Sequence, residues 1–92
     1  MVNRVIGMQT VSLIWFGRLS PLSAEVGTVW QIESQGCELG ALLDELAEST
    51  LELRQVMQSE HFKVAINDAL VERTAWVYPG DRVALLPPVT GG

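Results

Sequence analysis

The residues with the clearest chemical potential stand at the end of the 92-residue sequence, which closes with Pro87-Pro88-Val89-Thr90-Gly91-Gly92. This stretch has no charged side chain, its prolines favour an extended backbone, and its glycines lack the Cβ atoms that would obstruct a narrow channel. Such a tail can deliver the carboxyl group of Gly92 into the active site of another protein. Because a carboxylate is a poor electrophile, it first needs activation, for instance as an acyl-adenylate made with ATP. A sulfur nucleophile could then convert the adenylate to a thiocarboxylate.

Other reactive side chains favour ordinary structural roles. Cys37 and His61 are the only cysteine and the only histidine. We expect Cys37 to be a small apolar residue near a helix start and His61 to lie at the surface, rather than a catalytic pair. A structural zinc site takes about four ligands, which a lone cysteine and a lone histidine cannot supply. Asp44, Glu45 and Glu48 are expected to form the solvated face of a helix. No metal site is therefore predicted.

Composition limits the class of protein. Apolar residues make up 48% of the chain and charged residues 18%, which excludes an intrinsically disordered protein. Eleven acidic residues against six basic ones give a net charge of −5, so a nucleic-acid partner is not expected. A single cysteine allows no intrachain disulfide, and no apolar run approaches the roughly 18 residues of a membrane-spanning helix. We expect a cytoplasmic protein without a membrane or nucleic-acid partner.

Residue alternation predicts a strand near each end of the chain. Val11, Leu13 and Trp15 alternate with the other residues of a strand over 11–16, which Gly17 ends. The last strand covers 83–86, and the prolines after it stop it because they cannot donate to a ladder.

The middle of the chain changes period. Leucines at i, i+3, i+4 and i+7 from Leu39 to Leu46 predict an amphipathic helix that ends near Ser49 and Thr50. A weaker helix is predicted over 51–59. Further strands are predicted at 28–33, 63–66 and 69–72, with turns at Asn67-Asp68 and over 78–81.

The order of these elements predicts an α+β fold of the ubiquitin-like β-grasp type. A helix that crosses over between strands favours parallel pairing of the first and last strands, in the middle of a mixed sheet of about five strands with a helix on one face. The chain is expected to be one domain, 1–92, in which 1–8 form an N-terminal extension and 87–92 an extended tail.

The same strand geometry predicts an apolar surface. If Val11, Leu13 and Trp15 face the core, Ile14 and Phe16 face the other side. Leu86 then lies beside them, and the three make one exposed patch. Patches of this kind mark interaction sites. The alternative is that a helix or the N-terminal extension covers the patch.

The ending resembles a known family. The segment 80–92 is similar to the end of the small, sulfur-carrier subunit of molybdopterin synthase, 65–71 resembles that family's central hairpin, and 13–17 resembles its first strand. Other β-grasp sulfur carriers share only the Gly-Gly, so the whole Pro-Pro-Val-Thr-Gly-Gly ending is the specific feature. Many relatives have an Arg-Glu pair soon after the first strand, where this chain has Ser20-Pro21.

The resemblance implies a specific activity. An E1-like enzyme adenylates Gly92 with ATP, a sulfur donor makes the thiocarboxylate, and the loaded tail inserts into the large catalytic subunit. There it gives sulfur to cyclic pyranopterin monophosphate in molybdenum cofactor biosynthesis. Two small subunits usually flank a dimer of large ones. The catalytic side chains belong to the large subunit, so this chain binds no permanent cofactor and acts as a sulfurtransferase only within the complex. Positions matching Ile14, Phe16, Leu70 and Leu86 are expected at the partner interface.

Several other hypotheses stay open. The chain could carry sulfur for thiamine, tungsten-cofactor, tRNA-thiolation or cysteine pathways. It could be a ubiquitin-like tag joined to lysines of other proteins, or a β-grasp binding module with an inert tail. The Pro-Pro-Val-Thr before the glycines favours molybdopterin synthase.

Overall fold

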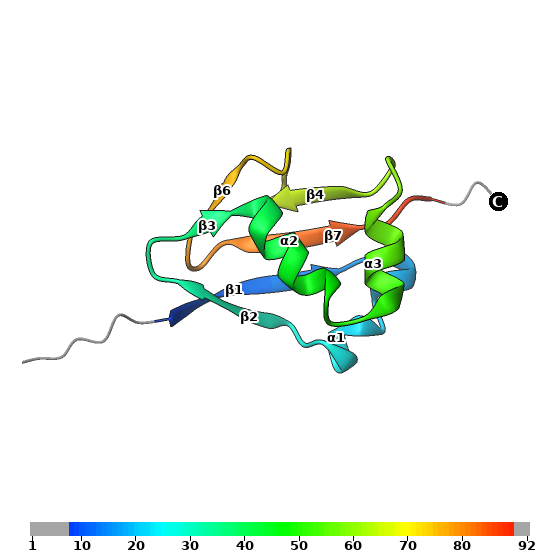
Figure 1. Cartoon of the computed structure of the whole chain (residues 1–92), viewed down its shortest axis with the longest axis horizontal. Coiled ribbons are helices and arrows are strands. Elements are labelled where there is room, and N and C mark those ends of the chain that lie inside the picture. Colours follow the sequence, from blue (N-terminus) through cyan, green and yellow to red (C-terminus); the bar gives the residue numbers. More distant parts are fainter. Residues whose placement is uncertain (1–7, 90–92) are drawn as a thin grey trace, which may run out of the picture.

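Five strands form one mixed sheet in the computed structural model, which describes residues 8–89 (Figure 1). β1 and β7 run parallel, and every other neighbouring pair in the sheet is antiparallel. The predicted parallel pairing of the first and last strands is therefore confirmed, as is the α+β, β-grasp architecture. In spatial order the strands are β2 (Val29–Glu33), β1 (Met8–Trp15), β7 (Arg82–Leu86), β4 (Lys63–Ile66) and β5 (Ala69–Val71).

The first strand begins earlier than the alternation indicated. β1 starts at Met8 rather than Val11, because Met8 to Thr10 pair with Glu33 to Gln31 of β2. These are backbone pairings that need no apolar alternation. Met8, expected in the N-terminal extension, is thus part of the sheet. The rest of that extension, residues 1–7, lies outside the described residues.

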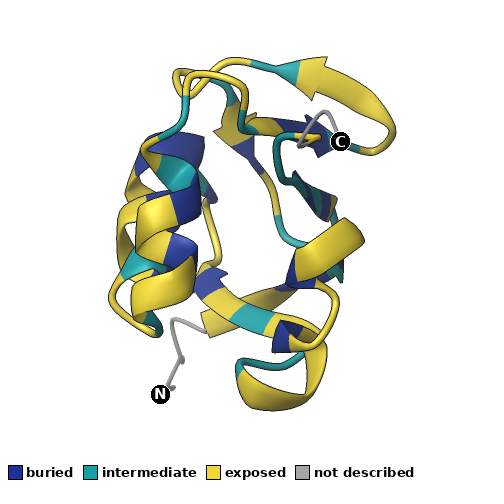
Figure 2. Cartoon of the chain, turned by 90° about the vertical axis from the view of Figure 1, so that its right-hand side faces the viewer, coloured by how far each residue is buried: buried dark blue, intermediate teal, exposed yellow. Residues whose placement is uncertain are grey.

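Two helices, α2 (Leu39–Ala47) and α3 (Leu51–Met57), cover one face of the sheet (Figure 1). Both were predicted. Thr50 begins α3 by accepting a hydrogen bond from the Leu53 amide at 3.0 Å, which satisfies a helix-end donor. The core lies between helices and sheet, where Figure 2 shows the buried positions. It includes the leucine stripe and the inward strand residues: Leu39, Leu42, Leu43, Leu46, Val11, Leu13, Trp15, Val83 and Leu85.

Four short elements lack a periodic sequence signal. They are too brief to show a repeat, with two to four residues each. Leu19 and Leu22 nevertheless anchor two of them in the core, with 0% and 1% of their surface exposed. The elements are the 3₁₀ turn η1 (Gly17–Leu19), the helix α1 (Leu22–Glu25), and the antiparallel pair β3 (Cys37–Glu38) and β6 (Trp76–Val77).

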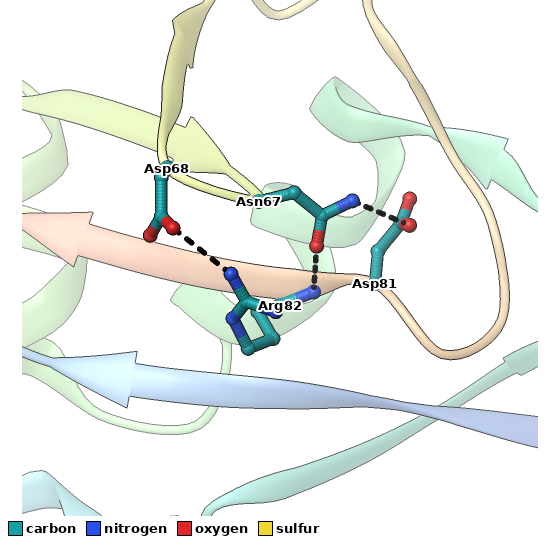
Figure 3. A network of polar contacts seen from close by, with 4 residues as sticks. All are labelled: Asn67, Asp68, Asp81 and Arg82. Carbon is teal, nitrogen blue, oxygen red and sulfur yellow. Dashed lines mark hydrogen bonds and ion pairs between the residues drawn. The ribbon is translucent and has the colours of Figure 1, made fainter.

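A polar network fixes the β4–β5 turn to the start of β7 (Figure 3). The Asn67 side-chain amide donates to Asp81 at 2.9 Å and accepts from the Arg82 amide at 2.9 Å. The Arg82 guanidinium contacts Asp68 at 3.0 Å. Asn67 and Asp68 both have positive φ, as a two-residue hairpin turn requires. The network therefore sets the register of the hairpin against the central strand.

Candidate functional site

The tail leaves the sheet from its central strand. The parallel register of β1 and β7 closes with Trp15 opposite Leu85, and the Phe16 amide then donates to the Leu85 carbonyl at 3.3 Å. β7 ends at Leu86, and Pro87 and Pro88 follow, as predicted. The tail therefore starts from a strand held on both sides, by β1 and by β4.

Gly17 lies against Pro87, the first residue of the tail. Its φ is +57°, and a Cβ built on it would lie 3.2 Å from Cγ of Pro87. Glycine thus lets the turn lie close under the proline ring. The turn itself is pinned, because the Leu19 amide donates to the Phe16 carbonyl at 3.0 Å and the Leu19 side chain is fully buried. The sequence pattern predicts the end of a strand at Gly17 but not its contact with Pro87.

The described part of the tail becomes more exposed from Pro87 to Val89. Pro87 and Pro88 are half-buried, and Val89 has 92% of its surface exposed. A hollow of about 440 Å³ lies along the tail, lined by Phe16, Gly17, Arg18, Leu86 and the residues 87–89. Thr90, Gly91 and Gly92, which were predicted to enter the partner and carry the sulfur, lie outside the described residues.

The sheet face opposite the helices carries the predicted apolar residues. Paired residues point to the same side of a sheet, so the register places Leu70, Ala65, Ala84 and Ile14 in one row across four strands. A second row, nearer the tail, joins Lys63 of β4 to Leu86 of β7. Phe16 follows β1 at the same end of the sheet.

We call Ile14, Phe16, Leu70, Ala84 and Leu86 the outer apolar face. Phe16 and Leu70 have 46% and 67% of their surface exposed, and the other three are half-buried. The helices α2 and α3 lie on the opposite side of the sheet (Figure 1), so neither of them covers this face. The structure thus brings the four predicted interface residues to one side of the sheet, with Phe16 and Leu86 beside the tail.

Two basic residues at this site were not singled out from the sequence. Arg18 lines the hollow along the tail, and Lys63 stands opposite Leu86. The alternation of β4 was the available signal, because Val64 faces the core and Lys63 must then face outward.

The residues set aside as structural do not form a second site within 8–89. Cys37 lies in β3, where partial burial raises the pKa of its thiol, helped by the negative charges of Glu45 and Glu33. A raised pKa disfavours the reactive thiolate. His61 lies in the turn between α3 and β4 and contacts Glu60 at 3.9 Å.

The acidic helix face is exposed, as predicted. Asp44 forms an ion pair with Arg73 at 2.9 Å, and Glu45 accepts a hydrogen bond from the Trp30 indole at 3.0 Å. The described part of the chain holds no group of three or more His, Cys, Asp or Glu side chains suited to a metal ion. No helix in residues 8–89 is long and apolar enough to cross a membrane.

The chain matches the model of the ThiS family over residues 15–92. The matched region includes the outer apolar face, apart from Ile14, and the whole tail.

Solved structures share the fold at low sequence identity. Small archaeal modifier protein 1 from Haloferax volcanii is 22% identical with a TM-score of 0.68, over 90% of this chain and 99% of that one. A Pyrococcus furiosus protein described as molybdopterin converting factor subunit 1 is also 22% identical with a TM-score of 0.68, over 88% and 99%. A Helicobacter pylori complex of subunits 1 and 2 of molybdopterin-converting factor contains a 22% identical chain with a TM-score of 0.55, over 91% and 100%.

Proposed function

The chain belongs to the ThiS family, and on this premise we propose that it is the sulfur-carrier subunit of a molybdopterin synthase. The observation that carries the proposal is the position at which the tail leaves the sheet. An uncharged, proline-stiffened segment leaves the central strand beside an exposed apolar surface, so one docking event can both bind a partner and present the end of the chain.

The proposed chemistry takes place on the carboxyl group of Gly92. An E1-like enzyme transfers AMP from ATP to that carboxylate and releases pyrophosphate. A sulfur donor then displaces AMP, which leaves a thiocarboxylate. In the synthase this sulfur attacks cyclic pyranopterin monophosphate, and hydrolysis of the resulting acyl bond returns the carboxylate to Gly92. ATP is thus consumed by the activating enzyme, and this chain supplies the acyl group.

The outer apolar face would hold the large catalytic subunit. Phe16 and Leu70 are the most exposed members of that face, and Leu86 connects it to the tail. In Helicobacter pylori, subunits 1 and 2 of molybdopterin-converting factor form a complex. We propose an equivalent complex here, with two small subunits flanking a dimer of large ones in the cytoplasm. The catalytic side chains would belong to the large subunit.

A protein-modifier function is the second candidate. Its support is the similarity to small archaeal modifier protein 1. A modifier would use the same adenylate but pass Gly92 to the amine of a lysine on another protein. Sulfur carriage for thiamine, tungsten-cofactor or tRNA-thiolation pathways shares the thiocarboxylate and differs only in the acceptor.

The decisive experiment is the intact mass of the protein after incubation with ATP, a sulfide source and the E1-like enzyme of its host. We expect a gain equal to replacing one oxygen by sulfur, mapped to Gly92. A variant without Gly91 and Gly92 should keep its fold and show no gain. No gain in the full chain, with an enzyme active on another carrier, would contradict sulfur carriage.

A second step separates the pathways. The loaded protein is mixed with the host's large subunit and cyclic pyranopterin monophosphate, and molybdopterin is measured. Formation of molybdopterin supports the proposed synthase. A loaded chain that forms none with an active large subunit would be a carrier for another acceptor, and isopeptide-linked targets in lysate would favour the modifier.

A further inference from the structure

Charge is distributed unevenly between the two sides of this acidic protein. The helical side carries the acids Asp44, Glu45, Glu48 and Glu52 along α2 and α3. The side of the outer apolar face carries basic residues as well as Asp68, which pairs with Arg82. Of the five basic residues in the described part of the chain, Arg18, Lys63 and Arg82 lie on or beside that face.

Two of these three cations are not neutralised within residues 8–89. Arg82 contacts Asp68 at 3.0 Å. Arg18 and Lys63 are exposed and form no ion pair with a carboxylate in the described part of the chain. The nearest acid to Lys63 in sequence, Glu60, contacts His61.

Arg18 and Lys63 stand on opposite sides of the departing tail. Arg18 follows β1 and lines the hollow beside the prolines, whereas Lys63 begins β4 opposite Leu86. Since β7 lies between β1 and β4, the tail leaves the sheet between two positive charges.

An extended tail would carry its end away from these charges. The five residues after Pro87 can extend by up to roughly 18 Å, so a tail inserted in a partner places Gly92 well inside while Arg18 and Lys63 remain at the surface. They would therefore meet the rim of the entrance rather than the reacting groups.

We propose that Arg18 and Lys63 dock against carboxylates that surround the tail entrance on the large catalytic subunit. This inference rests on the proposed function, because it names chemistry on the partner assigned there. Uncharged contacts of the outer apolar face supply affinity, and the two cations orient the chain so that the tail meets its channel. Electrostatic contacts at an interface rim mainly raise the association rate and fix orientation. The acidic helical side would be repelled by the same acidic surface, which would favour the orientation in which the tail faces its entrance.

The test is the association rate constant of the unloaded chain with the host's large subunit, measured for R18E, K63E and the double variant. The matched control is R54E, which makes the same change of net charge on α3, on the helical side. Arg18, Lys63 and Arg54 are all exposed, so the variants should fold, which circular dichroism checks.

At about 50 mM salt we expect each single reversal at Arg18 or Lys63 to slow association roughly threefold to tenfold, and the double variant more than about tenfold. At about 0.5 M salt the differences should shrink below about twofold, because charges are screened over a few ångströms. R54E should stay within about twofold of the wild type at both salt concentrations.

Equal slowing by R54E would overturn the inference, since net charge alone would then explain the effect. Unchanged rates for R18E and K63E would overturn it as well. In both cases the wild-type chain still binds the large subunit, so the proposed function survives. A wild-type chain that does not bind the large subunit at all would contradict both.

Discussion

Replacing Gly17 with alanine should weaken the fold and misdirect the tail together. Gly17 has a φ of +57°, a left-handed conformation that costs an L-residue about 1–2 kcal/mol. The new Cβ would also lie 3.2 Å from Cγ of Pro87, so the proline must shift by a few tenths of an ångström. We expect the free energy of unfolding to fall by about 1–2 kcal/mol, and Tm by roughly 4–16 °C for a domain of this size.

The tail effect is measured separately from stability. Because misplacement by about 1 Å can cost on the order of a hundredfold in rate, a smaller shift of Pro87 should slow thiocarboxylation of Gly92 by up to about tenfold. Urea denaturation gives the first quantity, and intact mass over time with the E1-like enzyme gives the second, at a temperature where the variant is folded.

The matched control is G80A. Gly80 has a φ of +89°, but nothing lies within 4 Å of a Cβ built there. This variant should also lose stability, because its backbone strain is comparable, but it should load sulfur at the wild-type rate. If G17A loads as fast as G80A, Gly17 does not direct the tail. If G17A is as stable as the wild type, the assigned strain is wrong.

Three further predictions follow from the same structure. Phe16→Asp should weaken binding of the large subunit by at least about tenfold and lower the free energy of unfolding by only about 1–1.5 kcal/mol, because 46% of the Phe16 surface is already exposed; unchanged affinity in a titration would argue against the outer apolar face. Leu85→Ala should lower the free energy of unfolding by about 2–5 kcal/mol, since Leu85 is fully buried at the centre of the core; a urea titration that shows a smaller loss would contradict the assigned packing. Burial, and then Glu45 and Glu33, raise the pKa of Cys37, so the folded thiol should need a higher pH for alkylation than the unfolded one, and any stabilisation linked to its protonation should fade as pH rises through the folded pKa; Glu45→Gln should lower the alkylation midpoint, and a midpoint that does not move would remove Glu45 as a cause.

The larger elements were predictable because their buried residues recur at the regular spacing of a helix or a strand. The leucine stripe of α2 and the alternation of β1 and β7 both follow from one side of the element facing the core. Strand parity alone predicts that Ile14, Phe16 and Leu86 face outward, and the register agrees.

The unpredicted parts depend on partners distant in sequence. Residues 8–10 join β1 only because β2 offers backbone groups beside them. β3 and β6 pair across about forty residues, and neither is long enough to show alternation. The same limit applies to the candidate site. Arg18 and Lys63 are separated in the chain and become neighbours of the tail only through the strand order.

The position of β7 has a consequence for how the protein is made. The last strand of the domain occupies the middle of the sheet, between β1 and β4. During synthesis the sheet therefore cannot close until that strand has left the ribosome. Until then β1 lacks its parallel neighbour, and the apolar side chains that pack against β7 stay exposed. Such a partly folded chain is prone to aggregation. Pairing of strands so far apart in the chain is also slow in itself. The sheet is therefore completed late, by the strand that directly precedes the proline-rich tail.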